Sequence, residues 1–280
     1  MPADLSRLLA KPGANDLDWE DPALPGRRIV LRSARPQHVS PQTPVLFVHH
    51  GVNRNGDDYR NYWLKLVDEA DLLVIAPEFP KDDFPGSAWY NFGNRTDEAG
   101  AATPREQWTY GVDQKVFTAL RAQAQTERAR YGVWGHSAGG QYVHRAISLG
   151  FRASVAAAVT ANAGTYATPE PDVPFPYGLG GTGLDDDALA RLLGFRLTVM
   201  AGTADIDAAS PNFPKEPAAM RQGATRHARA HFYLATARAQ AARLGLRCAW
   251  TIIDVEGVAH DGERMSAAAA PILSAALHAT

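Results

Sequence analysis

Short apolar runs alternate with amphipathic segments along most of this chain. Nearly continuous apolar runs are typical of strands that helices cover on both faces of a parallel sheet. We predict such strands, or candidates for them, at residues 28–31, 45–49, 72–76, 131–134, 153–160, 195–200 and 248–255. The runs are short and β-branched or aromatic residues recur in them, which favours strands over buried helices.

Between these runs, apolar residues recur at helical spacing. In residues 106–125, for example, Val112, Val116, Leu120 and Ala124 fall on one face. We predict further helices after Asp57 or Asp58 and at residues 141–149, 185–193, 226–244 and 265–277, the last with a kink or restart at Pro271. Strands that alternate with helices predict a mainly parallel α/β sheet with helices on both faces.

We interpret residues 1–280 as a single domain because no linker, repeat or low-complexity tract divides them. Residues 1–26 are rich in proline and aspartate, and we expect them to form an irregular N-terminal arm. The N-terminus lacks the apolar stretch of a secretion signal. We therefore expect a cytoplasmic enzyme, although a signal peptide removed before residue 1 would leave the same sequence.

Composition narrows the function only by exclusion. The 280 residues are 45% hydrophobic and 21% charged, and the formal net charge is −2, so no overall charge favours nucleic acid or a membrane surface as partner. No apolar run approaches the ~20 residues of a membrane span. The single cysteine, Cys248, can form no intrachain disulfide and is expected to pack as a small hydrophobe.

The segment with the clearest chemistry is residues 130–140, which read R-Y-G-V-W-G-H-S-A-G-G. A bare G-x-S-x-G arises by chance in many chains, but here a predicted strand precedes it and a predicted helix follows. That order makes a nucleophile elbow, a strained turn that lifts the serine hydroxyl above the sheet. Flanking glycines suit it because a side chain there would clash where strand and helix pass closely. We identify Ser137 as the candidate nucleophile.

A serine hydroxyl is a poor nucleophile near neutral pH and needs a base. In enzymes built on such an elbow, an acidic residue and then a histidine follow the serine along the chain. The histidines beyond Ser137 are His144, His227, His231, His260 and His278. Only His260 lies in a loop directly after a predicted buried strand, so we assign it as the candidate general base.

The acid is expected just after the preceding strand, where residues 202–207 read G-T-A-D-I-D. Asp205 and Asp207 could each orient the imidazole and stabilise its charged form. An Asx turn is the structural alternative for either residue. We favour Asp205 because it lies closer to the strand end, and keep Asp207 as the alternative.

Acyl transfer also needs donors for a developing oxyanion. The backbone N–H groups of Ala138 and Val52 are the candidates, with Asn53 as the alternative to Val52. We predict no metal site and no cofactor. His227 and His231 are the only pair at a helical ligand spacing, and they lack an obvious third ligand.

With these positions in place, the chain resembles the esterase and poly(3-hydroxybutyrate) depolymerase-like branch of the α/β-hydrolases. The resemblance runs from about residue 45 to residue 265. It rests on H-H-G-V-N-R-N at 49–55, G-H-S-A-G-G-Q at 135–141, G-T-A-D at 202–205 and G-V-A-H at 257–260, with further similarity at 90–91, 162–164 and 176–179. It implies the α/β-hydrolase fold and a Ser-Asp-His triad. Poly(aspartic acid) hydrolases are similar too.

The function we expect is a cofactor-free serine hydrolase that cleaves a carboxylic ester, small or polymeric, through an acyl-enzyme. One alternative is an amidase or peptidase with the same triad, such as a poly(aspartic acid) hydrolase. Another is a binding protein that keeps the fold without turnover. The oligomeric state does not follow from the sequence.

Two long loops are expected to form the substrate cleft, because both leave the carboxyl ends of predicted strands. The candidate substrate-binding residues are Asn53, Trp89, Tyr90, Asn91, Tyr166 and Tyr177. Aromatic rings with a few amides suit an acyl chain or a polyester segment, although any one ring could equally pack a loop onto the body. A polyanionic substrate would instead require Arg54, Arg95 and Arg221 to converge on the cleft.

Overall fold

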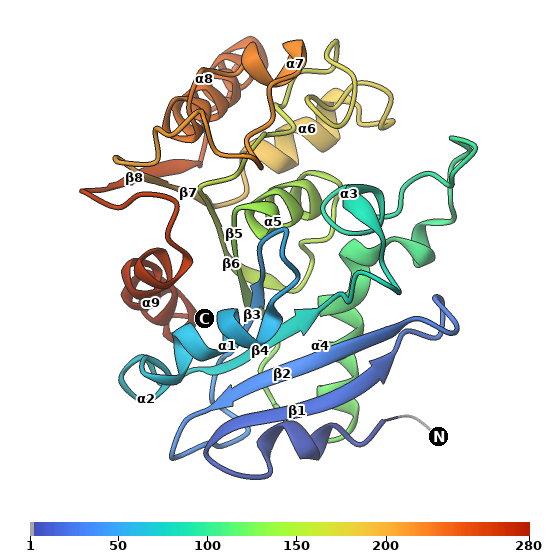
Figure 1. The fold of residues 1–280 in the computed structure, drawn as a ribbon, viewed down its shortest axis with the longest axis vertical. Helices are drawn as coiled ribbons and strands as arrows, with labels where there is room; N and C mark the ends of the chain where they lie inside the picture. Colours follow the sequence, from blue (N-terminus) through green and yellow to red (C-terminus); the bar gives the residue numbers. More distant parts are fainter. Residues whose placement is uncertain (1–2) are drawn as a thin grey trace.

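The computed structural model describes residues 3–280, which form an eight-stranded mixed sheet with helices on both sides (Figure 1). The strand order is β1-β2-β4-β3-β5-β6-β7-β8. The strands are β1 (Gly13–Glu20), β2 (Arg28–Arg35), β3 (Val45–His49), β4 (Leu73–Glu78), β5 (Tyr131–His136), β6 (Val155–Ala161), β7 (Leu197–Gly202) and β8 (Thr251–Val255). The pairings β1–β2 and β2–β4 are antiparallel and the others are parallel. The predicted mainly parallel α/β fold is confirmed.

The helices are η1 (Leu5–Leu9), α1 (Gly56–Leu64), α2 (Val67–Ala70), α3 (Gly86–Trp89), η2 (Arg105–Gln107), η3 (Thr109–Gly111), α4 (Val112–Ala122), α5 (Ala138–Ser148), α6 (Asp186–Leu193), α7 (Pro217–Met220), α8 (Arg226–Arg243) and α9 (Gly262–His278). Neighbouring residues of β3 enter different cores: Phe47 belongs to the core that also contains residues of α4, α5, α6 and α8, and Val48 to the one that contains residues of α1, α2 and α9. Burial on both faces explains the continuous apolar runs.

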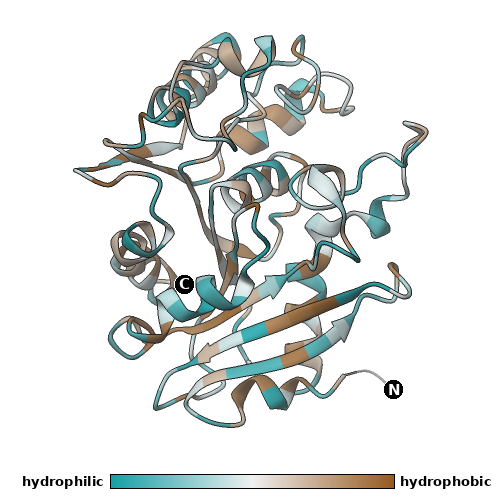
Figure 2. Cartoon of the chain, viewed as in Figure 1, coloured by the Kyte–Doolittle hydropathy of each residue, from teal (hydrophilic) through white to brown (hydrophobic). Residues whose placement is uncertain are grey.

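The expectation of an irregular N-terminal arm is wrong. Residues 5–9 form the 3₁₀ helix η1, and β1 pairs with β2 over its whole length. Leu17 and Trp19 are buried while Asp16 and Asp18 face outward, so the strand has the period-2 pattern of an edge strand with one covered face. Hydrophobic and hydrophilic segments alternate along it in Figure 2. Its high aspartate content concealed this alternation.

Several element boundaries also differ from the predictions. The helix expected at 106–125 begins as α4 only at Val112, after two 3₁₀ turns separated by the extended backbone of Trp108. It ends before Ala124, whose φ of 53° is incompatible with a continued helix. The last helix, α9, begins at Gly262 and runs through Pro271 without a restart. The last strand, β8, begins at Thr251 rather than 248.

Parallel strands place their carboxyl ends at one edge of the sheet, where the loops after β3, β5, β7 and β8 meet. No helix within residues 3–280 is both long and apolar enough to cross a membrane.

Candidate active site

Ser137 occupies a strained turn between β5 and α5. Its backbone has φ 59° and ψ −118°, a region that residues with a side chain rarely adopt. The glycines around it permit a very close approach of strand and helix. A Cβ on Gly135 would lie 2.2 Å from the carbonyl oxygen of Gly139, and one on Gly139 would lie 2.1 Å from that of His49. The turn therefore holds the serine hydroxyl at the carboxyl edge of the sheet.

Three side chains from separate loops are hydrogen-bonded in series there. His260 Nε2 lies 2.9 Å from Ser137 Oγ, and His260 Nδ1 lies 2.7 Å from Asp205 Oδ2. The Asp205 side chain is 1% exposed, whereas that of His260 is 31% exposed. Because an ionised carboxylate only accepts, Nδ1–H donates to Asp205 and Nε2 is left to accept from the serine hydroxyl. This arrangement can move a proton from Ser137 to His260.

Asp207 lies elsewhere. It is exposed, and its Oδ1 accepts a hydrogen bond of 2.8 Å from Ala209 N–H, as in an Asx turn. Of the two aspartates considered from the sequence, Asp205 is the one that meets His260.

Asn162, at the end of β6, connects the two loops that carry Asp205 and His260. Its Oδ1 accepts a hydrogen bond of 2.8 Å from Gly202 N–H, and its Nδ2 donates one of 3.1 Å to Ala259 O. Its φ of 46° lies in the left-handed region, which asparagine tolerates better than most residues. Sequence reasoning missed this role, although an asparagine directly after a buried strand was an available signal.

Arg226, the first residue of α8, was also missed. Its Nη1 lies 3.5 Å from Asp205 Oδ1, and the side chains of Arg226 and Asp205 are 3% and 1% exposed. The pair brings together residues 21 positions apart, and no local motif marks it. The guanidinium offsets the negative charge of a buried carboxylate.

His136, the residue before the serine, packs against the ring of His260. The rings of His136 and His260 have centroids 4.6 Å apart. Burial, above all, lowers the pKa of His136 well below its usual range, and its Nδ1 lies 2.8 Å from the hydroxyl of Tyr59. His136 is therefore neutral and does not oppose a positive charge on His260.

Val52 and Ala138 both line a cleft of about 190 Å³ that also contains Ser137. Within residues 3–280, neither of their backbone N–H groups donates to a protein acceptor. Ala138 N–H lies at the start of α5, where the helix dipole is positive. Two free donors beside the serine could bind a developing oxyanion.

The cleft contains some of the expected substrate-binding residues. Asn91 and Tyr177 line it together with Phe92, Gln141, Asn212 and Glu216, none of which was expected there. Gln141 Oε1 accepts hydrogen bonds from Asn91, Arg145 and Thr165, which fixes the amide in place. The lining thus includes amides, aromatic rings, the carboxylate of Glu216 and the guanidinium of Arg226.

The placement of Tyr90 and Tyr166 in the cleft is wrong, because both side chains are fully buried. Tyr90 donates a hydrogen bond of 2.7 Å to His50 O, and Tyr166 stacks on Tyr233 with ring centroids 4.4 Å apart. Trp89 and Asn53 also lie outside the residues that line the cleft; Trp89 packs under the guanidinium of Arg27. For Tyr90 and Tyr166, packing the aromatic ring in the core is more favourable than exposing it in the cleft.

The three arginines considered for a polyanionic substrate do not converge on the cleft. The guanidinium of Arg54 is buried and donates to Phe79 O and Gly86 O. Arg95 stacks on Phe175, and Arg221 pairs with Glu170 at 2.6 Å. None of the three lines the cleft around Ser137.

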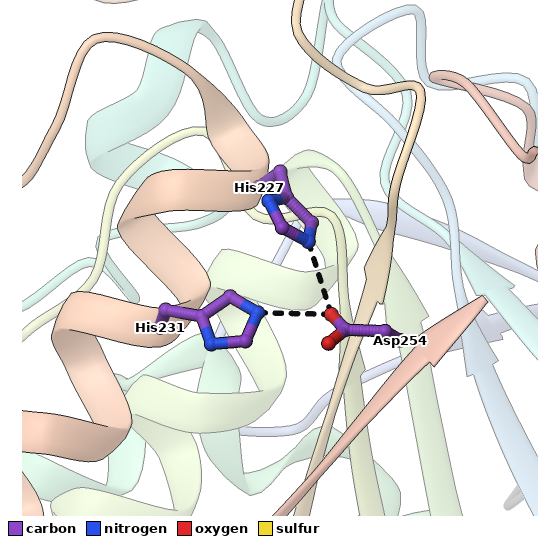
Figure 3. Close-up of side chains that lie close together, drawn as sticks. All are labelled: His227, His231 and Asp254. Carbon is purple, nitrogen blue, oxygen red and sulfur yellow. Dashed lines mark hydrogen bonds and ion pairs between the residues drawn. The ribbon is translucent and has the colours of Figure 1, made fainter. Parts of the chain in front are cut away.

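The expectation that His227 and His231 lack a third ligand is wrong. Asp254 of β8 accepts a hydrogen bond from each of them (Figure 3). Of these three residues, none lines the cleft.

Comparison with known proteins places this geometry in a family. No protein-family model matches the chain, and a search of curated proteins finds no match. Among solved structures, poly(3-hydroxybutyrate) depolymerase LpqC from Bordetella parapertussis is 40% identical with a TM-score of 0.91, over 96% of this chain and 92% of that one. The chain belongs to the α/β-hydrolase superfamily, in its poly(3-hydroxybutyrate) depolymerase-like branch.

A second similar α/β-hydrolase, poly(aspartic acid) hydrolase-1 from Sphingomonas sp. KT-1, is 36% identical with a TM-score of 0.90, over 94% of this chain and 99% of that one. An S-formylglutathione hydrolase from Agrobacterium tumefaciens, at 15% identity and a TM-score of 0.59 over 94% of this chain and 95% of that one, shares the fold alone. The protein is thus a hydrolase of the α/β fold.

Proposed function

We propose that this α/β-hydrolase is a serine hydrolase that cleaves carboxylic esters through an acyl-enzyme. The observation that carries the proposal is the hydrogen-bonded series Ser137–His260–Asp205 with its serine on a strained elbow. A binding function alone would need neither the series nor the strained backbone, which costs about 1–3 kcal/mol.

In the proposed mechanism, Ser137 Oγ attacks the ester carbonyl while His260 Nε2 accepts the hydroxyl proton. The N–H groups of Val52 and Ala138 stabilise the oxyanion of the tetrahedral intermediate. His260 returns the proton to the departing alcohol oxygen, which leaves the acyl group on Ser137. A water molecule then attacks the acyl carbonyl carbon while His260 accepts one of its protons. When the bond between that carbon and Ser137 Oγ breaks, His260 returns the proton to Oγ and the carboxylic acid departs.

In this proposal, Asp205 holds His260 in the tautomer that exposes Nε2 and stabilises the imidazolium formed in each step. Asn162 and Arg226 act as positioning residues, one by fixing the two loops and the other by pairing with the carboxylate. No cofactor has a part in these steps.

An ester of neutral acid units fits the cleft better than a polyanion. Glu216 lines it, and Tyr177 donates a hydrogen bond to that carboxylate. Arg226 also lines it, but its charge is directed at Asp205. A chain of carboxylates would therefore meet a negative group without a free positive one. Polyester segments and small esters are the substrate classes that we propose, in keeping with the similarity to LpqC.

Amide hydrolysis of poly(aspartic acid) is the second candidate function, and the 36% identical poly(aspartic acid) hydrolase-1 is what favours it. The same Ser-His-Asp chemistry would serve, with an amine as leaving group. The carboxylate of Glu216 in the cleft disfavours this function, because it would repel a substrate that carries many carboxylates.

Two measurements test the proposal. A fluorophosphonate should label Ser137 in the native protein and should fail to label Ser137→Ala; a native protein that is not labelled at Ser137 would exclude serine catalysis. A hydrolysis screen should then compare p-nitrophenyl esters and 3-hydroxybutyrate oligomers with aspartate oligomers. We expect turnover of the esters, and turnover of the aspartate oligomers alone would replace the ester assignment.

A further inference from the structure

A cluster of potential metal ligands lies outside the candidate active site, where α8 packs on the edge strand β8. His227 and His231 are four residues apart on α8 and therefore share one face, with ring centroids 4.7 Å apart. Their Nε2 atoms lie 3.0 and 2.9 Å from the same oxygen of Asp254, Oδ1 (Figure 3). Helix and strand thus direct two imidazoles and one carboxylate at a single point.

We propose that His227, His231 and Asp254 bind one divalent transition-metal ion, most suitably Zn²⁺. Ligand atoms from the three side chains lie within 4.8 Å of one another. Zinc bonds of about 2.0–2.1 Å in a tetrahedron place neighbouring ligand atoms about 3.4 Å apart. The two Nε2–Oδ1 distances would have to increase by only a few tenths of an ångström.

The donor set indicates which ion fits. Two imidazoles and a carboxylate suit Zn²⁺, Ni²⁺ or Cu²⁺, whereas Ca²⁺ and Mg²⁺ prefer oxygen ligands alone. The side chains of His227, His231 and Asp254 are 29%, 44% and 42% exposed. Solvent can therefore supply the fourth ligand of a tetrahedral ion.

The groups around the three ligands determine how tightly the site would bind a metal ion. Within residues 3–280, neither imidazole Nδ1 donates to a protein acceptor, so the rings lack the outer hydrogen bonds that orient tighter zinc sites. We expect micromolar rather than nanomolar affinity.

The ion would clamp together two elements that flank the candidate active site. His227 follows Arg226 directly, and its backbone N–H donates to Asp205 O at 3.3 Å. Asp254 lies in β8, the strand that leads into the loop with His260. None of the three ligands lines the cleft, so the role inferred is structural. This inference does not depend on the proposed esterase function.

Binding can be tested by isothermal titration of Zn²⁺ into the metal-free wild-type protein and into His227→Asn/His231→Asn. Asparagine keeps a polar group at each position while it removes the imidazole ligand. The control is His260→Asn, because His260 and Asp205 form a separate histidine–aspartate pair that could also attract zinc. We expect one ion per chain in the wild type and in His260→Asn, and none in the double variant. Absence of binding at roughly 100 μM Zn²⁺, well above the expected Kd, would overturn the site.

A second readout separates loss of ligands from loss of folding. Co²⁺ in a tetrahedral site of this kind should give visible absorption in the wild type that disappears in Asp254→Asn. Thermal unfolding should show a rise in Tm of about 5 °C at a Zn²⁺ concentration near 100 times the Kd in the wild type and in His260→Asn, and no rise in Asp254→Asn. Equal Tm shifts or equal Co²⁺ spectra in the wild type and in Asp254→Asn would contradict the assignment, as would a site lost only in His260→Asn.

Discussion

The carboxylate of Asp205 is shared between two partners, and the less obvious one is Arg226. One oxygen accepts from His260 at 2.7 Å, while the other lies 3.5 Å from the Arg226 guanidinium. Because Asp205 and Arg226 are almost fully buried, the arginine both offsets the carboxylate charge and limits its rotation. The orientation of His260 thus depends on a residue that begins the neighbouring helix α8.

We predict that Arg226→Gln lowers kcat about 10-fold or more and leaves KM for a small ester nearly unchanged, because Asp205 loses its second contact. Stability should fall by up to about 3 kcal/mol, since a buried carboxylate then keeps only one partner. Steady-state kinetics and urea unfolding measure the two effects. Arg238→Gln, an exposed position on the same helix, is the matched control and should change neither. Equal effects of the two variants would remove the positioning role of Arg226.

The two aspartates after β7 provide a direct test of the proposed acid. Asp205→Asn should lower kcat by roughly 10⁴, because the amide no longer selects the tautomer of His260 that exposes Nε2. Asp207→Asn should remain within about two-fold of wild type, since Asp207 is exposed and bonds only to Ala209 N–H among the described residues. Both rates come from initial-velocity measurements on one p-nitrophenyl ester. A greater loss in Asp207→Asn would reverse the assignment.

The close approach of α5 to β3 predicts a steric effect at Gly139. The methyl group of Gly139→Ala would lie 2.1 Å from the His49 carbonyl oxygen, a backbone atom that cannot turn away. We expect a loss of more than about 3 kcal/mol in unfolding free energy, or no folded protein. Gly194→Ala is the control, because its nearest neighbour lies at 3.4 Å and its φ is −80°. Thermal unfolding of both variants checks the difference; similar Tm values would show that the backbone yields.

Two buried histidines should make the protein sensitive to mild acid. His144 Nδ1 lies 2.8 Å from Gly140 O, and its Nε2 accepts from Ala167 N–H at 2.9 Å, so the neutral ring is fully hydrogen-bonded. Burial, assisted by Arg145, lowers its pKa well below the usual range. His50 has the same pattern, and burial lowers its pKa to about 3. A proton on either ring would break a hydrogen bond from a backbone N–H.

The sign of the effect follows from these lowered values. Above about pH 6.5 the folded and unfolded chains both hold these rings neutral, so they contribute no pH dependence. Below about pH 6.5 the two histidines bind protons in the unfolded chain but stay neutral in the folded protein. The unfolding free energy should therefore fall by up to about 1.4 kcal/mol per pH unit for each ring. Urea unfolding at pH 7.5 and 5.5 measures the fall. His144→Gln should show a smaller one, and an unchanged slope would contradict its contribution.

Local patterns were enough to predict much of this fold. The apolar run before Ser137 and the glycines on each side specify strand, turn and helix by local sterics alone, and the structure has them in that order. The alternation of Leu17 and Trp19 with aspartates was equally local and was overlooked.

Other features depend on contacts between distant segments and left no local pattern. Arg226 meets Asp205 across 21 residues, and Asn162 meets Ala259 across 97. The burial of Tyr90 likewise depends on a distant segment, since its hydroxyl donates to the backbone carbonyl of His50, 40 residues away. The order of strands along the chain was enough to predict which loops would meet. The side chains that fix those loops could be identified only from the structure.

The carboxylate of Glu216 in the cleft leads to a prediction about salt that distinguishes the substrate classes by sign. For a neutral ester, kcat/KM should change little between roughly 0.05 and 0.5 M salt. An uncharged substrate has no charge–charge interaction with Glu216 that salt could screen. For an aspartate oligomer it should rise with salt as the repulsion from Glu216 is screened, and Glu216→Gln should raise it already at low salt. Glu98→Gln, at an exposed position outside the cleft lining, should alter neither substrate. A steep fall of kcat/KM with salt on the aspartate oligomer would mean that positive charge attracts the substrate after all, and the poly(aspartic acid) alternative would then displace the ester assignment.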